Sequence, residues 1–473
     1  MTSKGHIMKL GDVITLLSGN TPSKSEEKYW GGEFPWASAK DMKQFFISQT
    51  QDKLTVLGIE KVSKVIPANT TLILTRGMTL VKDVPICVVN QKSSFNQDLK
   101  AVIPKGGVIE IEFVPYLLLG NKAKIHSLVD LAGHGTGRLA TDSLLDLEVY
   151  IPEQQDRRKM ICLFQGLDKK IQLNHQTNQT LEHIAQTLFK SWFVDFEPTR
   201  AKIAAKQVGQ DPERAAMAVI SGKTVAELER LDSTQLAQLK TTAALFPDGL
   251  VESELGDVPE GWKVKPFGNC LSMTIGGDWG KEQPDLKHTE KVKILRGTDL
   301  PKVYFGSDKK VPIRFVEAKK LASRKLFSGD IVIEVSGGSK NQPTGRSLFL
   351  TQEIVDRLGC DLAPASFCRL FRPNNPEVGL LLGLHLQLIY KAGKTWLYQN
   401  QSTGISNFQT KVFLEKELIV IPSEELQKCF SKKVLPLVQQ LSSCENQRLE
   451  KLRDTLLPKL LSGELSPTQP EVA

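Results

Sequence analysis

Hydrophobic residues recur at helical spacing in a long segment in the middle of the chain. They step by four and three residues, the heptad pattern of helices that pack side by side along a seam. Polar residues in such a seam lower its stability but fix the register of the paired helices. The pattern predicts one helix over residues 153–197, about 60 Å long for about 40 residues at 1.5 Å per residue. The seam positions are Met160, Phe164, Leu167, Ile171, Asn174, Asn178, Leu181, Ala185, Leu188 and Trp192.

A second seam lies near the C-terminus, with a polar centre around residues 444–448. The stretches NQTLEHIAQTLFKSWF (178–193) and NQRLEKLRDTLLPKLL (446–461) share six of sixteen residues, where unrelated stretches share about one. The repeat predicts a second long helix over 423–465 and a coiled coil of the two. Two amphipathic helices packed on separate cores are the alternative. The apolar positions of the second seam are Val434, Leu437, Leu441, Leu449, Leu452, Leu456 and Leu460.

The segment between the two helices, residues 198–255, is rich in Ala, Lys and Glu, and we expect a helical connector there. Within it, DPERAAMAVISGK (211–223) and TVAELERL (224–231) begin with Asp and Thr, which cap helix N-termini well. The last residues, 466–473, are predicted to be a disordered tail.

Two globular segments remain, residues 1–152 and 256–422, and each combines apolar strand-like runs with a few helical stretches. Their sequences echo one another: KLGDV (9–13) matches PFGNC (266–270), and PWASAKDM (35–42) matches KILRGTDL (293–300). Each segment also ends in an apolar run closed by Ile-Pro. The predicted fold class is therefore α+β, with two globular domains in a pseudo-two-fold repeat joined by two long helices.

Composition narrows the class of protein. No run approaches the roughly 20 apolar residues of a membrane helix, and seven scattered Cys without a Cys-x-x-Cys pair fit reduced thiols. We therefore expect a cytoplasmic protein without a membrane partner. The net charge of +8 is concentrated in the second globular segment, where 24 Lys and Arg against 17 Asp and Glu give +7. A basic domain of this kind suggests a polyanionic partner.

The sequence lacks the usual motifs of enzymes that act on DNA or nucleotides. There is no G-x-x-x-x-G-K-[ST] phosphate-binding loop, no G-x-G-x-x-G after a strand, and no Asn/Asp-Pro-Pro-aromatic motif of an amino-methyltransferase. The seven His residues show no metal-ligand spacing. Asp285 with Glu317 and Lys319 imitates the metal site of some nucleases, but so short a match also arises by chance. The pattern indicates a binding protein with no catalytic residue and no metal ligand.

The order of these parts resembles the specificity subunits of type I restriction–modification systems, and the resemblance covers essentially the whole chain. It is carried by the first helix with its flanks (147–198), DPERAAMAVISGK (211–223), FPDGLVESELGDVPEGW (246–262), EVSGGSKNQPTGR (334–346) and TLLPKLLSGEL (455–465).

The resemblance implies that residues 1–152 and 256–422 are target-recognition domains, each reading one half of a bipartite double-stranded DNA sequence. It implies that the helices over 153–197 and 423–465 form an antiparallel coiled coil that sets the gap. It also implies two copies of a methyltransferase subunit and a restriction/translocase subunit as partners. S-adenosylmethionine, ATP and Mg would act on those partners, and none is expected in this chain.

DNA contacts need cations for phosphates and Arg, Asn, Gln, Ser or Thr for base edges. On this basis we expect DNA contacts from two matched sets of polar loops. In the first domain these are Lys40, Arg76, Lys82, His134 and Arg138; in the second they are Arg296, Lys340, Asn341, Gln342, Thr344, Arg346, Asn400 and Gln401. Trp192, Phe193 and Phe196 are expected on an outward face that binds a partner subunit.

Alternatives stay open at this level. The stretch SGGSKNQPTGR (336–346) also fits an ordinary polar hairpin turn, and AKKLASRK (318–325) fits either a phosphate contact or a solvated helix face. For the whole chain, the rival interpretations are a structural coiled-coil scaffold without a DNA role and a solitary nuclease that uses Asp285 and Lys319.

Overall fold

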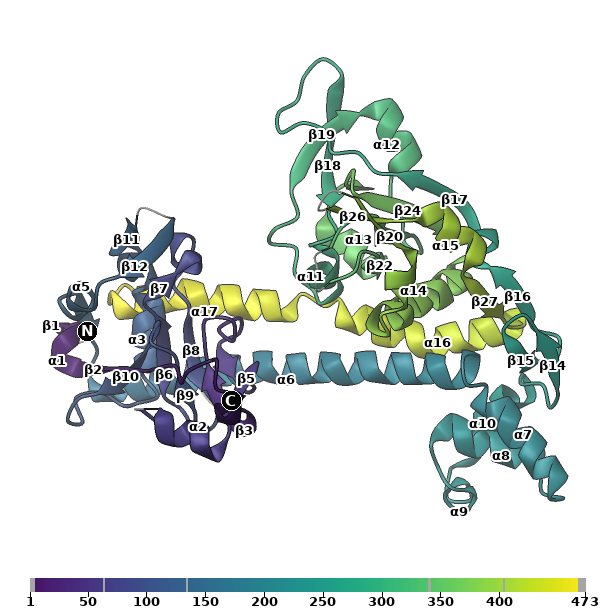
Figure 1. Cartoon of the computed structure of the whole chain (residues 1–473), viewed down its shortest axis with the longest axis horizontal. Helices are drawn as coiled ribbons and strands as arrows, with labels where there is room; N and C mark the ends of the chain where they lie inside the picture. Colours follow the sequence, from purple (N-terminus) through teal and green to yellow (C-terminus); the bar gives the residue numbers. More distant parts are fainter. Residues whose placement is uncertain (1–4, 63, 133–134, 339–341, 403–404, 467–473) are drawn as a thin grey trace. The chain divides into compact units, whose positions relative to one another are not determined.

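The structure is a computed structural model of the chain and describes residues 5–62, 64–132, 135–338, 342–402 and 405–466. It divides into two compact units, Met1–Leu173 with Arg448–Ala473 and Asn174–Gln447. We call them unit 1 and unit 2, and Figure 1 labels their elements. In the part of the chain that the structure describes, we find no helix that meets the length and apolarity of a membrane span.

Unit 1 is built on a five-stranded sheet with two smaller sheets and a terminal strand pair. The central sheet has the order β2 (Ile14–Ser18), β10 (Leu99–Pro104), β6 (Thr71–Leu74), β8 (Ile86–Val89) and β4 (Phe46–Ile47). The smaller sheets have the orders β5 (Asp52–Leu54), β3 (Trp30–Ala37), β9 (Ser94–Phe95) and β11 (Val129–Ala132), β12 (Thr136–Leu139), β7 (Arg76–Gly77). The terminal pair is β1 (His6–Lys9) with β13 (Glu148–Ile151). The helices are α1 (Leu10–Val13), η1 (Glu27–Tyr29), α2 (Val56–Lys61), η2 (Met78–Val81), α3 (Val114–Gly120), α4 (Lys122–Ser127) and α5 (Thr141–Leu145).

Unit 2 contains the same set of sheets. Its central sheet has the order β17 (Leu271–Gly276), β24 (Cys368–Pro373), β20 (Ile331–Glu334) and β22 (Ser347–Phe349). The smaller sheets have the orders β19 (Ile313–Glu317), β18 (His288–Leu295), β23 (Leu362–Pro364) and β21 (Ser336–Gly337), β26 (Ile405–Phe408), β25 (Gln399–Ser402). The terminal pair is β16 (Lys263–Pro266) with β27 (Leu418–Ile421). The helices of this part are η3 (Phe267–Cys270), α11 (Leu300–Tyr304), α12 (Ala318–Arg324), α13 (Gln352–Leu358), α14 (Pro376–Lys391), η4 (Lys394–Tyr398) and α15 (Thr410–Lys416).

The two halves correspond in every sheet except for β4, which adds a fifth strand to the central sheet of unit 1, and this agrees with the sequence echoes. The strand orders β2-β10-β6-β8, β5-β3-β9, β11-β12-β7 and β1-β13 are repeated as β17-β24-β20-β22, β19-β18-β23, β25-β26-β21 and β16-β27. The matched residues Asp41 and Asp299 make the same local hydrogen bond. The Asp41 carboxylate accepts from the Ser38 N–H (2.8 Å), and the Asp299 carboxylate accepts from the Arg296 N–H (3.2 Å), in each case three residues earlier. The predicted repeat is therefore one of topology as well as of sequence.

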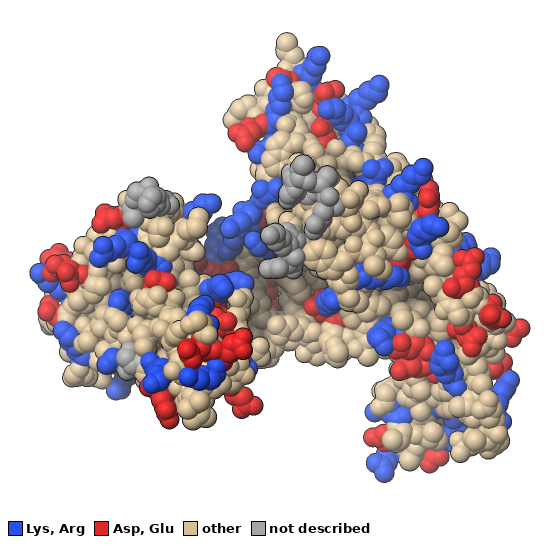
Figure 2. Space-filling view, in the orientation of Figure 1, with Lys and Arg blue, Asp and Glu red and all other residues tan. Residues whose placement is uncertain are grey.

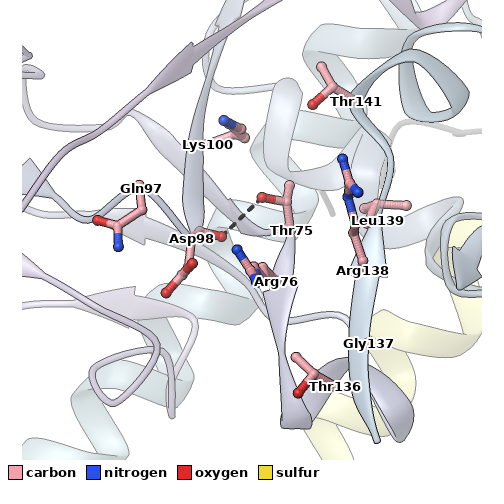
Figure 3. A pocket seen from close by; sticks show the side chains of 10 residues that line it. All are labelled: Thr75, Arg76, Gln97, Asp98, Lys100, Thr136, Gly137, Arg138, Leu139 and Thr141. Atoms are coloured by element: carbon pink, nitrogen blue, oxygen red, sulfur yellow. Dashed lines mark hydrogen bonds between the residues drawn. The ribbon is translucent and has the colours of Figure 1, made fainter. Parts of the chain in front are cut away.

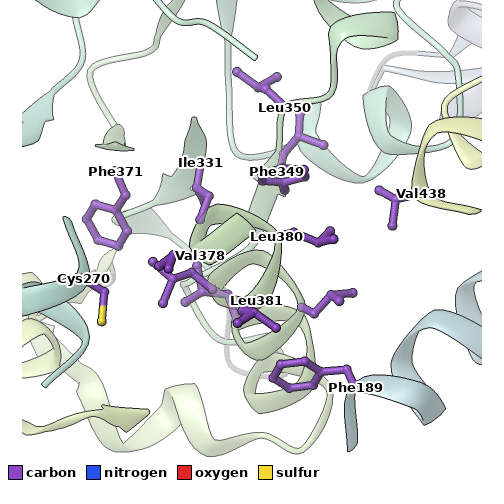
Figure 4. Packing of buried hydrophobic residues seen from close by; sticks show 14 of the residues in the cluster. Phe189, Cys270, Ile331, Phe349, Leu350, Phe371, Val378, Leu380, Leu381 and Val438 are labelled. Atoms are coloured by element: carbon purple, nitrogen blue, oxygen red, sulfur yellow. The ribbon is translucent and has the colours of Figure 1, made fainter. Parts of the chain in front are cut away.

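Apolar side chains from the sheet and from one long helix form the core of unit 2. Helix α14 begins at Pro376 behind Asn375, whose side chain accepts the Val378 N–H (2.8 Å). Figure 4 shows α14 residues packed between sheet residues such as Phe371 and residues of two long helices, Phe189 and Val438. Nine of the sixteen α14 residues are buried, so the helix is apolar on nearly every side.

Long helices pair in antiparallel fashion inside each unit. The first helix, α6 (Gln154–Phe193), begins in unit 1 and ends in unit 2. In unit 1, the α6 residue Asp168 accepts a hydrogen bond from Arg453 Nη1 of α17 (Glu445–Leu461) at 2.8 Å. In unit 2, Asn174 of α6 donates to Asn446 Oδ1 (2.8 Å), whereas Trp192 at the far end of α6 lies against Phe430 of α16 (Glu424–Leu441).

The second long helix is not continuous. The sequence predicts one helix over 423–465, but α16 ends at Leu441 and α17 begins at Glu445. The Ser442 hydroxyl donates back to Gln439 O (2.9 Å), and the Ser442 carbonyl accepts from the Arg357 guanidinium. These bonds replace the amide bonds that would continue the helix, and they explain the break.

In unit 1, the stretch 114–128 forms two short helices, α3 and α4, which are separated at Asn121. The connector contains the helices α7 (Glu197–Gln207), α8 (Pro212–Ser221), α9 (Val225–Leu228) and α10 (Ser233–Ala244), and ends in a hairpin of β14 (Leu250–Ser253) and β15 (Gly256–Pro259). The predicted caps are confirmed: Asp211 accepts the Glu213 N–H (2.9 Å), and Thr224 forms a capping box with Glu227. The predicted tail lies almost wholly outside the described residues.

Candidate nucleic-acid interfaces

The three-stranded sheets β11-β12-β7 and β25-β26-β21 carry the matched polar loops that the sequence points to. In unit 1, Arg138 lies directly opposite Arg76 across β12 and β7, and opposite Asp130 across β11. Residues directly opposite each other in antiparallel strands project from the same face. Asp130, Arg138 and Arg76 therefore form one row across the sheet, which we call the unit 1 row.

The equivalent row of unit 2 has different chemistry. Asn407 lies opposite Ser336 across β26 and β21, and opposite Asn400 across β25. Asn400, Asn407 and Ser336 form the unit 2 row, so that Arg138 corresponds to Asn407 and Arg76 to Ser336. The backbone beside both rows is the same, because Gly77 (φ +151°) and Gly337 (φ +144°) follow Arg76 and Ser336 in a conformation that favours glycine.

The unit 1 row borders a pocket of about 490 Å³. Figure 3 shows Arg76 and Arg138 at the pocket together with Lys100 of β10. Gln97, Asp98 and Thr141 also line it, so the pocket combines three cations with hydrogen-bonding groups. This is the combination that contacts with phosphates and base edges require.

Among the described residues, no ion pair holds the guanidinium of Arg76 or of Arg138, and the carboxylate in the same row belongs to Asp130, opposite Arg138. Both side chains are exposed. The nearby Asp98 carboxylate accepts a hydrogen bond from Asn96 Nδ2 (3.2 Å), and Lys100 Nζ donates to Ser18 Oγ (2.5 Å). Two like charges placed directly opposite each other are unfavourable in a sheet, which favours an anionic ligand as their partner.

Around the unit 2 row, the residues that correspond to Asp98 and Lys100 are Phe367 and Arg369. The correspondence follows from register, because Lys100 pairs with Ile73 as Arg369 pairs with Ile333. Phe367 is exposed, and Arg369 Nε donates to Thr274 Oγ1 (2.7 Å). No pattern in the sequence singled out Lys100, Phe367, Arg369 or Asn407 as candidate DNA contacts. Aligning GRL (137–139) with SNF (406–408) would have revealed Asn407.

Two residues predicted to contact DNA in unit 2 have structural roles in the domain. Thr344 is fully buried, and its N–H donates to Gln399 Oε1 (3.0 Å). Arg346 donates from Nε to the buried Glu334 carboxylate (2.8 Å) and also from Nη2, and these bonds raise the pKa of Arg346. Each residue is therefore engaged inside the domain in this structure, and contact of either with DNA stays a prediction.

Arg296 also has partners inside the domain, unlike Lys40, the predicted DNA contact in the matching stretch of the first domain. Its guanidinium donates to both carboxylate oxygens of Asp299, from Nε (2.7 Å) and Nη2 (2.9 Å), and to Lys310 O. Its hydrogen bonds to the Asp299 carboxylate raise the pKa of Arg296. Lys40, by contrast, is exposed in the turn before Asp41.

The remaining predicted contacts are distributed over the loops near the two rows. Lys82, Gln342 and Asn400 are exposed. His134, Lys340 and Asn341 lie outside the described residues, and for Gln401 the structure describes only the backbone strand. Their contacts with DNA stay predictions.

The aromatic residues at the end of α6 are buried, so the predicted outward face is not there. Trp192, Phe193 and Phe196 are 1%, 5% and 7% exposed. Phe193 lies against Phe430 and Trp262, with ring centroids 4.8 and 5.8 Å apart. The expectation of an exposed face is wrong, because Phe430 of α16 and Trp262 at the start of the second domain cover these residues. They lie in the core and do not themselves form a surface that a partner could contact.

A second basic region lies on the β18–β19 hairpin and α12, where Lys and Arg gather in Figure 2. It includes Lys319, which is exposed, and Lys320, which pairs with Asp278 (3.4 Å). The nuclease-like residue Asp285 binds Lys281 Nζ (2.6 Å) and His288 Nδ1 (2.8 Å). Across the described ranges, no cluster of three His, Cys, Asp or Glu is arranged to hold a metal ion.

Comparison with known proteins gives one family. Residues 3–183 match the family model of the type I restriction modification DNA specificity domain. The HindI specificity subunit of Haemophilus influenzae is 31% identical over 380 residues, which cover 76% of this chain and 79% of that protein. The MjaIX specificity subunit of Methanocaldococcus jannaschii is 24% identical over 468 residues, covering 97% of this chain and 93% of that protein.

A solved structure shares the fold. The crystal structure of the type I restriction–modification S subunit from M. genitalium matches with a TM-score of 0.50 and 14% identity, over 97% of this chain and 96% of that one. The relative from Haemophilus influenzae is close enough, and is covered over enough of its length, to settle the family. This chain belongs to the family of type I restriction enzyme specificity subunits.

Proposed function

We propose that this chain gives a type I restriction–modification complex its sequence specificity by reading two separate segments of one DNA duplex. The observation that carries the proposal is the doubled fold: two domains of one topology each present a three-stranded sheet with an outward polar row. A β-ribbon fits the major groove of DNA, where base edges are distinguishable. Two such sheets on one chain suit a bipartite target better than they suit a scaffold.

We propose residues 1–152 and 256–422 as the two target-recognition domains. The pairing of β1 with β13 and of β16 with β27 supports two separate domains, because each pair brings an early strand of a domain beside its last strand. In the second domain, β15 at residues 256–259 pairs instead with β14 of the connector. Residues 153–197 and 423–465 would then be the spacer helices, and 198–255 the connector.

The proposed partners follow from the family. They are double-stranded DNA, two copies of a methyltransferase subunit, and a restriction/translocase subunit. The repeat supports two copies of one partner, because two similar domains offer two similar surfaces. S-adenosylmethionine, ATP and Mg would be bound by these partners. A cytoplasmic location is part of the proposal, since cellular DNA is the proposed ligand.

The test is to produce the chain together with its methyltransferase subunit in a host without other DNA methylation, and to map methylated bases across the host genome. We expect one motif with two specified segments and an unspecified gap between them. Methylation without the chain, or at a single uninterrupted motif, would contradict the proposal. A scaffold without a DNA role would leave the methylated motif unchanged when the chain is omitted.

A further inference from the structure

We propose that Arg76 and Arg138 form a pair that reads guanines in the half-site bound by the first domain. The inference rests on the proposed function, because it assumes that each domain binds one half of a DNA target. It assigns a specific base chemistry to one row of side chains and predicts G·C pairs in one half of the target.

The geometry places both guanidinium groups on one face of a narrow ribbon. Arg138 pairs with Arg76 in the register of β12 and β7, so both side chains project from the same side beside the pocket. Opposite residues in antiparallel strands lie about 4.5 to 5.5 Å apart. Two long side chains at this separation can reach neighbouring base pairs, and Arg binds O6 and N7 of guanine through two parallel hydrogen bonds.

Neither side chain has another task in the described structure. Both are exposed, and among the described residues no ion pair joins either guanidinium to a carboxylate, although Asp130 lies opposite Arg138 in the strand register. The other conspicuous Arg residues of the equivalent region in unit 2 are engaged: Arg346 binds Glu334, and Arg296 binds Asp299. Within the described ranges, no hydrogen bond or ion pair engages the guanidinium of Arg76 or Arg138, so their donors can bind a ligand.

A comparison of the two halves separates base contacts from phosphate contacts. Phosphates are the same in every target, so a phosphate-binding position can remain cationic in both domains. Lys100 and its counterpart Arg369 fit this description, and each donates to a hydroxyl on the neighbouring strand, Ser18 or Thr274. Base-reading positions must differ when the half-sites differ. Arg76 and Arg138 are replaced by Ser336 and Asn407 at the same sheet positions.

The experiment uses the full chain assembled with its methyltransferase subunit, and maps methylated sites in genomic DNA for a set of variants. Arg138→Lys and Arg76→Lys keep the charge but lose the two-pronged donor geometry. Lys100→Ala is the control for a phosphate contact, and Asn407→Ala is the control for the other half-site. Purified complexes are then compared in competition binding to duplexes that carry each base at the affected position.

We expect the wild-type motif to contain two G·C pairs in one half-site. Each Arg→Lys variant should reduce the preference for guanine at one of these positions by about tenfold to a hundredfold. Lys100→Ala should weaken binding without changing the motif, and Asn407→Ala should alter only the other half-site. Elution with the methyltransferase in gel filtration shows that a variant has folded and assembled. Arg76→Gln and Arg138→Gln serve as second variants where a Lys variant fails to assemble.

The inference is overturned by a half-site without G·C pairs, or by Arg variants that lower methylation at all sites while the motif is unchanged. It is also overturned if the Arg variants and Asn407→Ala alter the same half-site. These outcomes leave the proposed function intact, because the wild-type chain still directs methylation to a bipartite motif. Failure of the wild-type chain to direct methylation to any bipartite motif would instead contradict the proposed function.

Discussion

The two halves of this chain have one topology and two surface chemistries. The strand order is repeated sheet by sheet, yet the outward row reads Asp130, Arg138 and Arg76 in one half and Asn400, Asn407 and Ser336 in the other. Backbone geometry is set by buried residues and by glycines such as Gly77 and Gly337. The difference teaches that the repeated scaffold leaves the exposed positions free to carry a different recognition chemistry in each half.

The two halves also differ in chemistry at one pair of matched positions beneath the outward row. In unit 2, buried Glu334 binds Arg346. In unit 1, the corresponding positions are Leu74 and Pro85, because the Leu74 N–H donates to Pro85 O as the Glu334 N–H donates to Arg346 O. One half therefore has an ion pair at the positions where the other has two apolar residues, Leu74 and Pro85.

Breaking this ion pair should have the largest effect on stability. Arg346→Met leaves the Glu334 carboxylate, which is 3% exposed, without its partner, and we expect a loss of about 3–5 kcal/mol in the free energy of unfolding. The double variant Glu334→Leu, Arg346→Met makes both positions apolar, as they are in unit 1, and should recover most of the loss. Denaturant unfolding of the three proteins measures both values. A double variant as unstable as the single one would show that two apolar residues cannot replace the ion pair.

The pKa values of two buried carboxylates, Glu417 in unit 2 and Asp168 in unit 1, are shifted in opposite directions. Burial alone would raise the pKa of Glu417, but hydrogen bonds from His385, Lys394 and Tyr398 lower it to about 2. In unit 1, burial raises the pKa of Asp168 despite the hydrogen bonds from Arg453 and Tyr116. Ionised Glu417 therefore stabilises unit 2 above pH about 4.5, and this stability is lost as the pH falls toward 2.

Replacing Glu417 tests whether its ionised form stabilises unit 2 and whether this stability is lost as the pH falls. Glu417→Gln should lower the stability of unit 2 by about 3 kcal/mol at pH 7, and the deficit should shrink as the pH falls below 4.5. Hydrogen exchange read separately over the strands of each unit measures the effect. Unit 1 should be unaffected and serves as the internal control. A deficit that stayed constant between pH 7 and pH 3 would contradict the role of the ionised carboxylate.

The phosphate-type cations should have smaller and matched effects. Lys100→Ala and Arg369→Ala should each weaken DNA binding by roughly fivefold, or about 1 kcal/mol, for all sequences alike. Each should also reduce the slope of log affinity against log salt concentration by about 0.9. Binding isotherms at several salt concentrations give both values. A changed motif in either variant would mean that the position reads bases, and the contrast with Arg76 and Arg138 would fail.

The smallest effect is expected at Lys40, which is exposed. Lys40→Ala should change the free energy of unfolding by less than about 0.5 kcal/mol. Arg296→Ala is the contrast in the other half, because it leaves Asp299, 3% exposed, without its guanidinium partner. Thermal unfolding of the two variants measures the difference, and Arg296→Ala should be the less stable. Equal effects would show that the Arg296–Asp299 pair contributes nothing beyond an exposed cation.

The fold was largely predictable because its signals are local or repeated. Heptad spacing predicted the α6 helix, capping residues such as Asp211 and Thr224 predicted the connector helices, and paired echoes predicted the repeat. The break at Ser442 was not predictable, because it depends on Arg357, a residue of the globular domain that is distant in sequence.

The candidate site was predictable only in part. Arg76 and Arg138 stand out in the sequence, but their position opposite each other depends on the register of two strands that are far apart in the chain. Arg346 looked equally suitable until the structure placed Glu334 against it. Trp192 looked like an exposed aromatic residue because the sequence does not show that Phe430 covers it. Residue type indicates which groups can bind DNA, whereas tertiary contacts decide which of them are available.

The most direct test of the two-domain reading of DNA is a chain whose two recognition domains are the same. Residues 256–422 are replaced by a second copy of residues 1–152, and the variant is produced with the methyltransferase subunit. Mapping of methylated genomic sites should show that the half-site of the first domain now occurs twice, with a gap between the copies, and that the second half-site has disappeared. Persistence of the original second half-site, in a variant that assembles and methylates, would contradict the assignment of one half-site to each domain.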